Sequence, residues 1–230
     1  MKISPSLSDV KKIAASGEYD VLPISCEILS DFTTPIETMK ILKNVSTHCY
    51  MLESASANEK WGRYTFLGFD PKLEITCANG EMKVGNLKFK TDNPSDSIRQ
   101  ILAEYKSPRF NYLPSFTGGL VGYFSYDYLT YSEPTVKCNL EDTEDFKDVD
   151  LMLFDKVIAF DNVLQKIILI VNMSLNDIEI GYNKAVMELK NLYDLLKSGN
   201  KINEPSGKLL SDFTPLFEKE AYCGMVEKAK

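Results

Sequence analysis

The 230-residue sequence contains one histidine, His48, and one tryptophan, Trp61. With one histidine, a metal cluster built on several histidines is excluded, and we assign no Ser-His-Asp triad around His48 within this chain. A histidine beside a strand is usually structural, and we interpret His48 in that way. Trp61 lies in a polar loop and is interpreted as a packing anchor rather than a ligand contact.

Cysteines are few and widely scattered, and no two of them form a CxxC pair. A disulfide framework or a zinc site would require a denser pattern. The sequence therefore predicts reduced thiols in a cytoplasmic protein. The five positions are Cys26, Cys49, Cys77, Cys138 and Cys223.

Long apolar runs and basic clusters are also lacking. No segment approaches the roughly 20 apolar residues of a membrane span, and the N-terminus has no apolar stretch typical of a signal peptide. The net charge is −7 without a Lys/Arg patch, which argues against nucleic-acid and membrane partners. The acidic run 141–150 lacks the glycine and glutamate spacing of an EF-hand, so we interpret it as a solvated loop and assign no metal ligand.

A glycine-rich stretch, Gly118-Gly119 followed by Gly122, raises the question of a phosphate-binding loop. It contains neither GxGxxG nor a Walker lysine, and it continues into aromatic residues typical of a strand. We therefore predict close backbone packing or a bulge at these glycines.

The apolar pattern predicts antiparallel strands combined with helices. Helical spacing is found at 7–15, 35–42 and 178–196, and a helix with Asn93 as N-cap and Pro94 in its first turn is expected to reach residue 105. The segment 73–89 alternates like a meander with its first turn at Asn79-Gly80. Further strands are predicted at 48–54, 62–68, 116–126, 151–160 and 164–171. The fold class is α+β, with antiparallel β-sheets of meander or sandwich type packed with helices.

The C-terminal part changes in composition. Residues 198–206 read as a linker, and the residues after them begin an amphipathic helix that is still under way at Lys230. We predict an N-terminal effector-binding domain over 1–197, a linker over 198–215, and the truncated start of another domain over 216–230.

Two neighbouring strand candidates could carry a binding site. Alternation along 48–54 places Tyr50, Leu52 and Ser54 on one face, and Met51 and Glu53 on the other. An α-amino acid needs an acceptor for its ammonium, donors for its carboxylate and an apolar slot for its side chain. The end of this strand offers such groups.

The partner strand adds Arg63 as a cation and Tyr64 as an aromatic wall. The simpler alternative is an ordinary sheet edge at which Glu53 pairs with Arg63 across the loop, an interaction that is common on surfaces and contributes little. From spacing alone, this alternative is favoured.

Several motifs resemble anthranilate synthase component I in order and spacing. They are LESAS at 52–56, GRYTFLG at 62–68, DP at 70–71, FTGGLVGYFSYD at 116–127 and DVDLMLFDKVIAFDN at 148–162. The resemblance covers 21–171 and resumes at 217–230, where the family's chorismate-binding domain begins. A sister family, aminodeoxychorismate synthase component I of the folate pathway, shares much of this pattern. An unrelated small-molecule sensor domain is the remaining alternative.

The resemblance implies a specific activity for the complete enzyme. That enzyme converts chorismate and ammonia to anthranilate and pyruvate in tryptophan biosynthesis, with Mg2+ in its active site and a glutamine amidotransferase subunit as the ammonia source. In the family, the LES segment forms part of the site for the feedback inhibitor L-tryptophan, which carries over to Leu52, Glu53 and Ser54. Ser54 is the strongest candidate, and Arg63 and Tyr64 are weaker ones. The chorismate and Mg2+ ligands belong to the catalytic domain, so the resemblance implies no catalytic residue and no cofactor in this segment, which alone is expected to be inactive.

Overall fold

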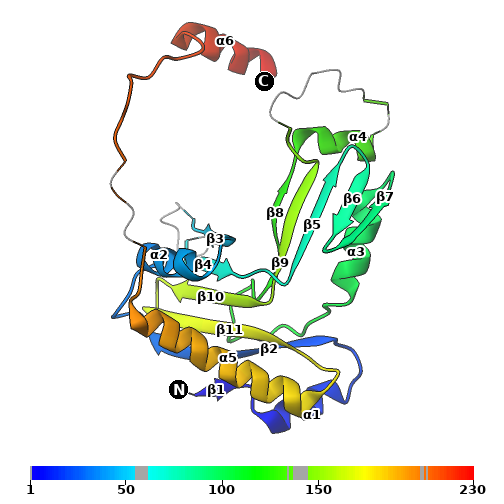
Figure 1. The fold of residues 1–230 in the computed structure, drawn as a ribbon, viewed down its shortest axis with the longest axis vertical. Helices are drawn as coiled ribbons and strands as arrows, with labels where there is room; N and C mark the ends of the chain where they lie inside the picture. Colours follow the sequence, from blue (N-terminus) through cyan, green and yellow to red (C-terminus); the bar gives the residue numbers. More distant parts are fainter. Residues whose placement is uncertain (1, 55–61, 134, 137–144, 203–204, 206) are drawn as a thin grey trace.

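The computed structural model describes residues 2–54, 62–133, 135–136, 145–202, 205 and 207–230. These residues form two antiparallel sheets packed with helices, which confirms the α+β prediction (Figure 1). The six-stranded sheet has the order β1 (Ile3–Ser4), β2 (Val21–Leu29), β11 (Lys166–Ser174), β10 (Lys156–Asp161), β4 (Tyr64–Phe69), β3 (Cys49–Leu52). The five-stranded sheet has the order β7 (Leu87–Lys90), β6 (Glu81–Val84), β5 (Leu73–Ala78), β9 (Val149–Phe154), β8 (Gly119–Phe124).

Helices occur between and after the strands. The predicted helices are all present. The helix predicted over 178–196 corresponds to α5, which extends two residues further, to Ser198. The helices are α1 (Leu7–Ala14), α2 (Pro35–Val45), α3 (Pro94–Ala103), the 3-10 turn η1 (Tyr126–Tyr128), α4 (Leu129–Ser132), α5 (Ile178–Ser198) and α6 (Lys219–Ala229).

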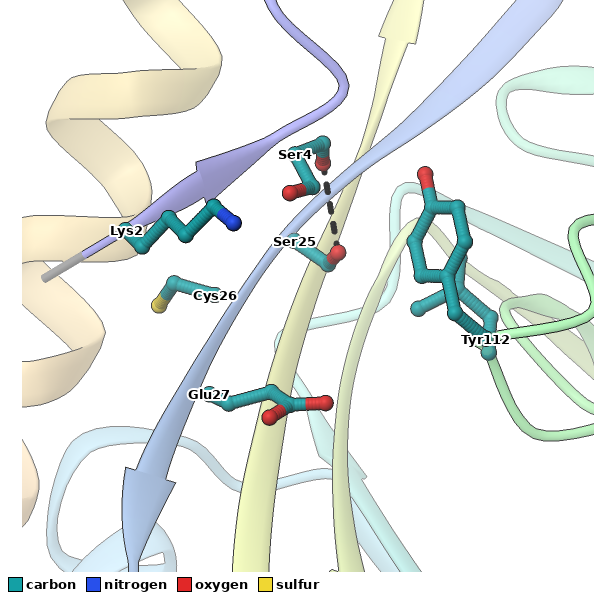
Figure 2. A pocket seen from close by; sticks show the side chains of 7 residues that line it. Lys2, Ser4, Ser25, Cys26, Glu27 and Tyr112 are labelled. Carbon is teal, nitrogen blue, oxygen red and sulfur yellow. Dashed lines mark hydrogen bonds between the residues drawn. The ribbon is translucent and has the colours of Figure 1, made fainter.

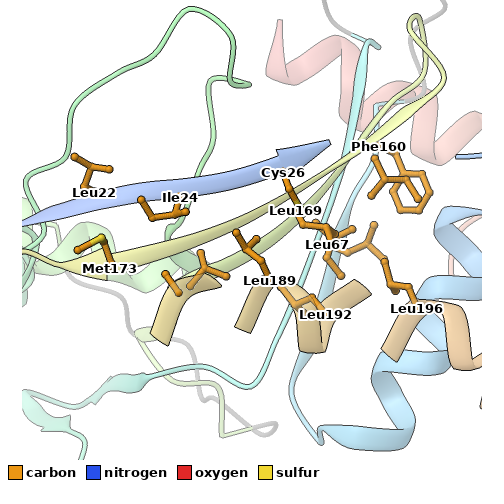
Figure 3. Close-up of a cluster of buried hydrophobic side chains, with 14 of the residues drawn as sticks. Leu22, Ile24, Cys26, Leu67, Phe160, Leu169, Met173, Leu189, Leu192 and Leu196 are labelled. Atoms are coloured by element: carbon orange, nitrogen blue, oxygen red, sulfur yellow. The ribbon is translucent and has the colours of Figure 1, made fainter. Parts of the chain in front are cut away.

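The main core lies between α5 and the six-stranded sheet. Leu189, Leu192 and Leu196 point from α5 onto the strands, as Figure 3 shows, and each is at most 2% exposed. Burying a leucine of this kind contributes about 2 kcal/mol relative to leaving it in water. The Asp177 side chain accepts a hydrogen bond from the first turn of α5, and Gly199 ends the helix in the left-handed conformation.

The opposite face of the same sheet is covered by an irregular segment rather than by a helix. Phe110, Leu113 and Phe116 pack there against Val157 and neighbouring strand residues. This face also carries the aromatic side chains of β4, so the covering segment lies next to the predicted binding hairpin.

The five-stranded sheet has a smaller core. Ile98 of α3 packs against Ile75, Met82 and Leu151, and Tyr128 and Tyr131 pack at its edge. The turn Asn79-Gly80 has positive φ at both residues (51° and 76°), as the predicted two-residue hairpin turn requires. The meander over β5, β6 and β7 is thereby confirmed.

The predicted single strand over 151–160 is wrong, because the chain changes sheets in its middle. β9 pairs with β5 and β8, whereas β10 pairs with β11 and β4. The crossing at Asp155 is fixed by Asn172, whose backbone N–H and side-chain amide donate to the Asp155 carbonyl at 2.8 and 3.1 Å. The same amide donates to the Thr117 carbonyl at 2.6 Å. The charged pair Asp155-Lys156 interrupts the apolar run at this point, but two charged residues do not by themselves specify a change of sheet.

The glycine-rich strand is shorter than predicted, because β8 spans only Gly119–Phe124. A Cβ built on Gly122 would lie 1.9 Å from the carbonyl oxygen of Asp150 on β9. Close backbone packing is therefore confirmed at this position, in place of a phosphate loop.

The single histidine lies at the surface of the protein. The His48 Nδ1 atom lies 3.8 Å from a carboxylate oxygen of Glu74, and both side chains are nearly half exposed. Four cysteines, Cys26, Cys49, Cys77 and Cys223, are free thiols, while Cys138 and Trp61 lie outside the described residues. Among the described helices, none has the length and apolar character needed to cross a membrane.

Tyr131 ties α4 to the Asn79-Gly80 turn. Its hydroxyl donates to Asp148 at 2.7 Å and accepts from the Gly80 N–H at 2.8 Å, and the Asn79 N–H donates to the same Asp148 oxygen. We expect Tyr131→Phe to lower the free energy of unfolding by about 1–2 kcal/mol, because a part-buried network loses its central group. Urea denaturation measures this.

The matched control is Tyr126→Phe, since Tyr126 is 86% exposed and its hydroxyl makes no hydrogen bond within the described chain. Equal stabilities of the two variants would contradict a role for the Tyr131 hydroxyl.

Candidate functional site

The predicted hairpin is formed by β3 and β4 at one edge of the six-stranded sheet. The register pairs Leu52 with Phe66 and Tyr50 with Gly68. Tyr50 is buried, while Met51 faces the α5 side of the sheet, which confirms the alternation predicted for these residues. Leu52 is 47% exposed, so it leaves an apolar surface at the strand end.

Aromatic side chains gather on the face of the sheet where Leu52 lies opposite Phe66. The ring centroids of Tyr64 and Phe66 are 5.8 Å apart, and those of Phe66 and Phe116 are 5.6 Å apart. Tyr50 extends the cluster with an edge contact to Phe116 at 6.4 Å. Such a cluster can receive another aromatic group by stacked or edge contacts. Phe66 and Phe116 were missed in the sequence, because nothing local indicates that residues 50 positions apart meet.

Tyr50 fills the space above Gly68. A Cβ built on Gly68 would lie 2.2 Å from the Tyr50 ring, so the glycine is required by this close approach. The Tyr50 side chain is buried, and its hydroxyl has no hydrogen-bond partner in the described part of the chain. Burial raises the pKa of this phenol far above its ordinary value, so the hydroxyl is neutral at all physiological pH values.

Arg63 pairs with Asp161 of β10, which contradicts the alternative that it pairs with Glu53. The Arg63 Nε lies 3.2 and 3.1 Å from the two carboxylate oxygens, and Nη2 lies 2.7 Å from one of them. Asp161 is 2% exposed and also accepts from the N–H groups of Val163 and Leu164. A carboxylate ligand at Arg63 would have to compete with this intramolecular pair.

The charge of Asp161 is stabilised by these donors. Burial by itself raises the pKa of the Asp161 carboxyl, but the hydrogen bonds from Arg63 and from two backbone N–H groups outweigh burial and leave the pKa below its ordinary value. The Arg63 guanidinium also lies 4.9 Å from the centre of the Tyr64 ring. The Arg63 guanidinium therefore contacts both the Asp161 carboxylate and the Tyr64 ring.

The structure thus brings together part of the predicted set. Leu52 and Tyr64 share one face of the hairpin, and Glu53 and Ser54 follow the end of β3 as exposed residues. Residues 55–61, which complete the connection to β4, lie outside the described residues.

A separate cavity of about 410 Å3 lies at the other end of the sheet, beside β1 and β2 (Figure 2). The Ser25 hydroxyl donates there to the Ser4 carbonyl at 3.2 Å, and the Tyr112 ring forms a wall. Glu27 also lines it, but its carboxylate is paired with Lys166 at 2.8 Å.

The described residues contain no group of three or more His, Cys, Asp or Glu side chains arranged to hold a metal ion. No Mg2+ ligand is therefore assigned among the described residues.

Comparison with known proteins places the chain in a family. The sequence profile described as chorismate binding enzyme matches residues 47–230. The chain belongs to the chorismate-binding enzyme family. Its relatives include anthranilate synthase component 1 of Acetivibrio thermocellus, which is 32% identical over 98% of this chain and 47% of that protein. The same enzyme component of Aquifex aeolicus is 32% identical over 100% of this chain and 48% of that protein.

A solved structure supports the same family relationship. The crystal structure of anthranilate synthase component I from Streptococcus pneumoniae TIGR4 aligns with a TM-score of 0.54 at 26% identity, over 88% of this chain and 44% of that one. The chain spans about half the length of the relatives it matches. The family match runs from 47 to 230 without a break at 198–215, so it does not test the predicted domain boundary, which stays a prediction.

Proposed function

We propose that this chain is the N-terminal part of anthranilate synthase component I. The complete enzyme would convert chorismate and ammonia to anthranilate and pyruvate in tryptophan biosynthesis in the cytoplasm. The support is the family match together with relatives of that name that align over nearly the whole chain. The Mg2+ and chorismate ligands would lie in the other half of the protein, and a glutamine amidotransferase subunit would supply ammonia.

The reaction itself can be tested on the full-length protein. Incubation with chorismate, Mg2+ and an ammonium salt is expected to yield anthranilate, which is followed by its fluorescence. Accumulation of aminodeoxychorismate instead would assign the protein to the sister family and contradict the proposal.

The proposed role of this segment is feedback control by L-tryptophan at the β3–β4 hairpin. The observation that carries it is the exposed end of β3, where Leu52 lies opposite Phe66 within an aromatic cluster. The indole would contact Leu52 and Tyr64, Glu53 would accept from the ammonium, and Ser54 would hydrogen-bond to the effector. The opposite wall would come from the catalytic half.

Inhibition would then be a coupling between two sites. Tryptophan would stabilise an arrangement of the two halves that is less active, and chorismate would favour the other arrangement. Because binding coupling is reciprocal, saturating chorismate is expected to weaken tryptophan binding.

The test is Ser54→Ala in the full-length enzyme. Loss of one hydrogen bond to a charged effector group costs about 1.5–3 kcal/mol, so the inhibition constant for tryptophan should rise about 10- to 100-fold. The kcat and the KM for chorismate should not change. Ser8→Ala on α1, far from the hairpin, is the control and should leave inhibition as it is. An unchanged inhibition constant in Ser54→Ala would remove Ser54 from the site.

The 230-residue chain alone offers a second check. We expect no turnover of chorismate and weak or absent tryptophan binding, because the other wall of the site is missing. Micromolar binding of tryptophan in calorimetry would contradict the two-walled site.

A further inference from the structure

A second cavity, of about 400 Å3, lies where the chain crosses between the two sheets, under the first half of α5. Its apolar floor is formed by Val171 and Met173 of β11 and by Ala185 of α5, which are all at least nine-tenths buried. Gly181, one turn earlier on α5, also lines it. The volume falls in the range of small-molecule sites.

Four charged side chains line this cavity without partners of opposite charge. Lys72, Asp155, Lys184 and Glu188 form no ion pair and no side-chain hydrogen bond among the described residues. The Lys72 ammonium lies 5.2 Å from the centre of the Tyr105 ring.

The absence of pairing between Lys184 and Glu188 has a geometric reason. They are one turn apart on α5, with the lysine on the N-terminal side, which is the weaker orientation for an ion pair within a helix. By contrast, Lys156 in the same cavity is neutralised by Asp70 at 2.8 Å. Two positive and two negative charges thus remain around an apolar floor.

Such a set discriminates between ligand classes. Asp155 and Glu188 would repel a phosphate or a dicarboxylate, and Lys72 and Lys184 would repel a simple cation. A zwitterion satisfies both pairs, and an apolar side chain can occupy the floor over Val171.

We propose that this cavity binds a free α-amino acid with an apolar side chain. The ammonium is held by Glu188 and Asp155, the carboxylate by Lys184 and Lys72, and the side chain lies on the buried floor. This site is distinct from the hairpin, because Val171 and Met173 face α5, whereas Tyr64 and Phe66 belong to the opposite face of the sheet.

The other cavities support this choice less well. In the cavity of Figure 2 the carboxylate of Glu27 is already paired with Lys166. In a cavity at the C-terminal end of β2, the ammonium of Lys197 itself lies 4.1 Å from the centre of the Phe32 ring and occupies the aromatic wall.

The test is an NMR titration of the 15N-labelled 230-residue chain with L-methionine and L-leucine. At least one of them should shift the amide signals of 181–188 and of Asn172. N-acetyl-L-methionine lacks the ammonium and L-methioninamide lacks the carboxylate, so each should bind on the order of tenfold more weakly than L-methionine.

Variants locate the site. Lys184→Ala and Glu188→Gln should each raise the dissociation constant on the order of tenfold, while Lys190→Ala, on α5 but outside the cavity, should leave it unchanged. The same spectra show whether each variant is folded. Absence of shifts at millimolar ligand, or equal affinity in all three variants, would overturn the proposal. Shifts confined to Leu52 and Tyr64 would also overturn it, while leaving the hairpin proposal intact.

Discussion

Gly122→Ala is expected to lower the free energy of unfolding by about 3–5 kcal/mol. The new Cβ would lie 1.9 Å from the Asp150 carbonyl oxygen and 2.8 Å from the Leu151 Cα, both backbone atoms of the paired strand β9. Backbone cannot rotate away as a side chain can, so β8 and β9 would have to separate locally. The φ of Gly122, +155°, adds strain for any residue with a Cβ.

Urea denaturation followed by circular dichroism measures this effect. Gly224→Ala is the control, because a Cβ there would meet nothing within 4 Å and alanine suits the interior of α6 better than glycine. If Gly122→Ala unfolded within about 1 kcal/mol of the wild type, the close β8–β9 contact would be wrong.

Asp161→Asn is expected to lower the free energy of unfolding by about 2–3 kcal/mol. The substitution keeps the size of the side chain but removes the charge that accepts from Arg63, Val163 and Leu164. It leaves the Arg63 guanidinium without its counter-ion. Because the Arg63 side chain is 39% exposed and can reach water, the loss is smaller than for a fully buried pair. Asp194→Asn, at an exposed position of α5, is the control and should have almost no effect.

The effect of Asp161→Asn should depend on pH in a defined direction. The folded-state pKa of Asp161 lies below its ordinary value of 3.8, since the hydrogen bonds from Arg63 and the backbone outweigh burial. The carboxylate therefore contributes its stabilisation fully above pH of about 4, and this contribution is lost as the pH falls through the lower folded-state value. The difference between wild type and variant should be constant near neutrality and should shrink in acid. A difference that grew in acid would contradict this assignment.

Local sequence determined several elements of this protein. Asn79-Gly80 specified its turn because few residues adopt positive φ without strain. The apolar spacing along α5 specified a helix and the face that it buries, because a helical period of 3.6 leaves only one stripe toward the sheet. The motifs around Leu52 and Gly62 also carried the family resemblance. They could do so from the sequence alone because each is a contiguous stretch of chain.

Tertiary structure decided which of these pieces meet. The partner of Arg63 is 98 positions away along the chain, and the change of sheet at Asp155 follows from strand pairings in two different sheets. Phe116 contacts Phe66, and Lys72 lines the same cavity as Lys184, only because the sheets and α5 bring distant segments together. Sequence periodicity reports which face of an element is buried, but pairing between elements depends on the free energy of the whole packed arrangement, which no local pattern contains.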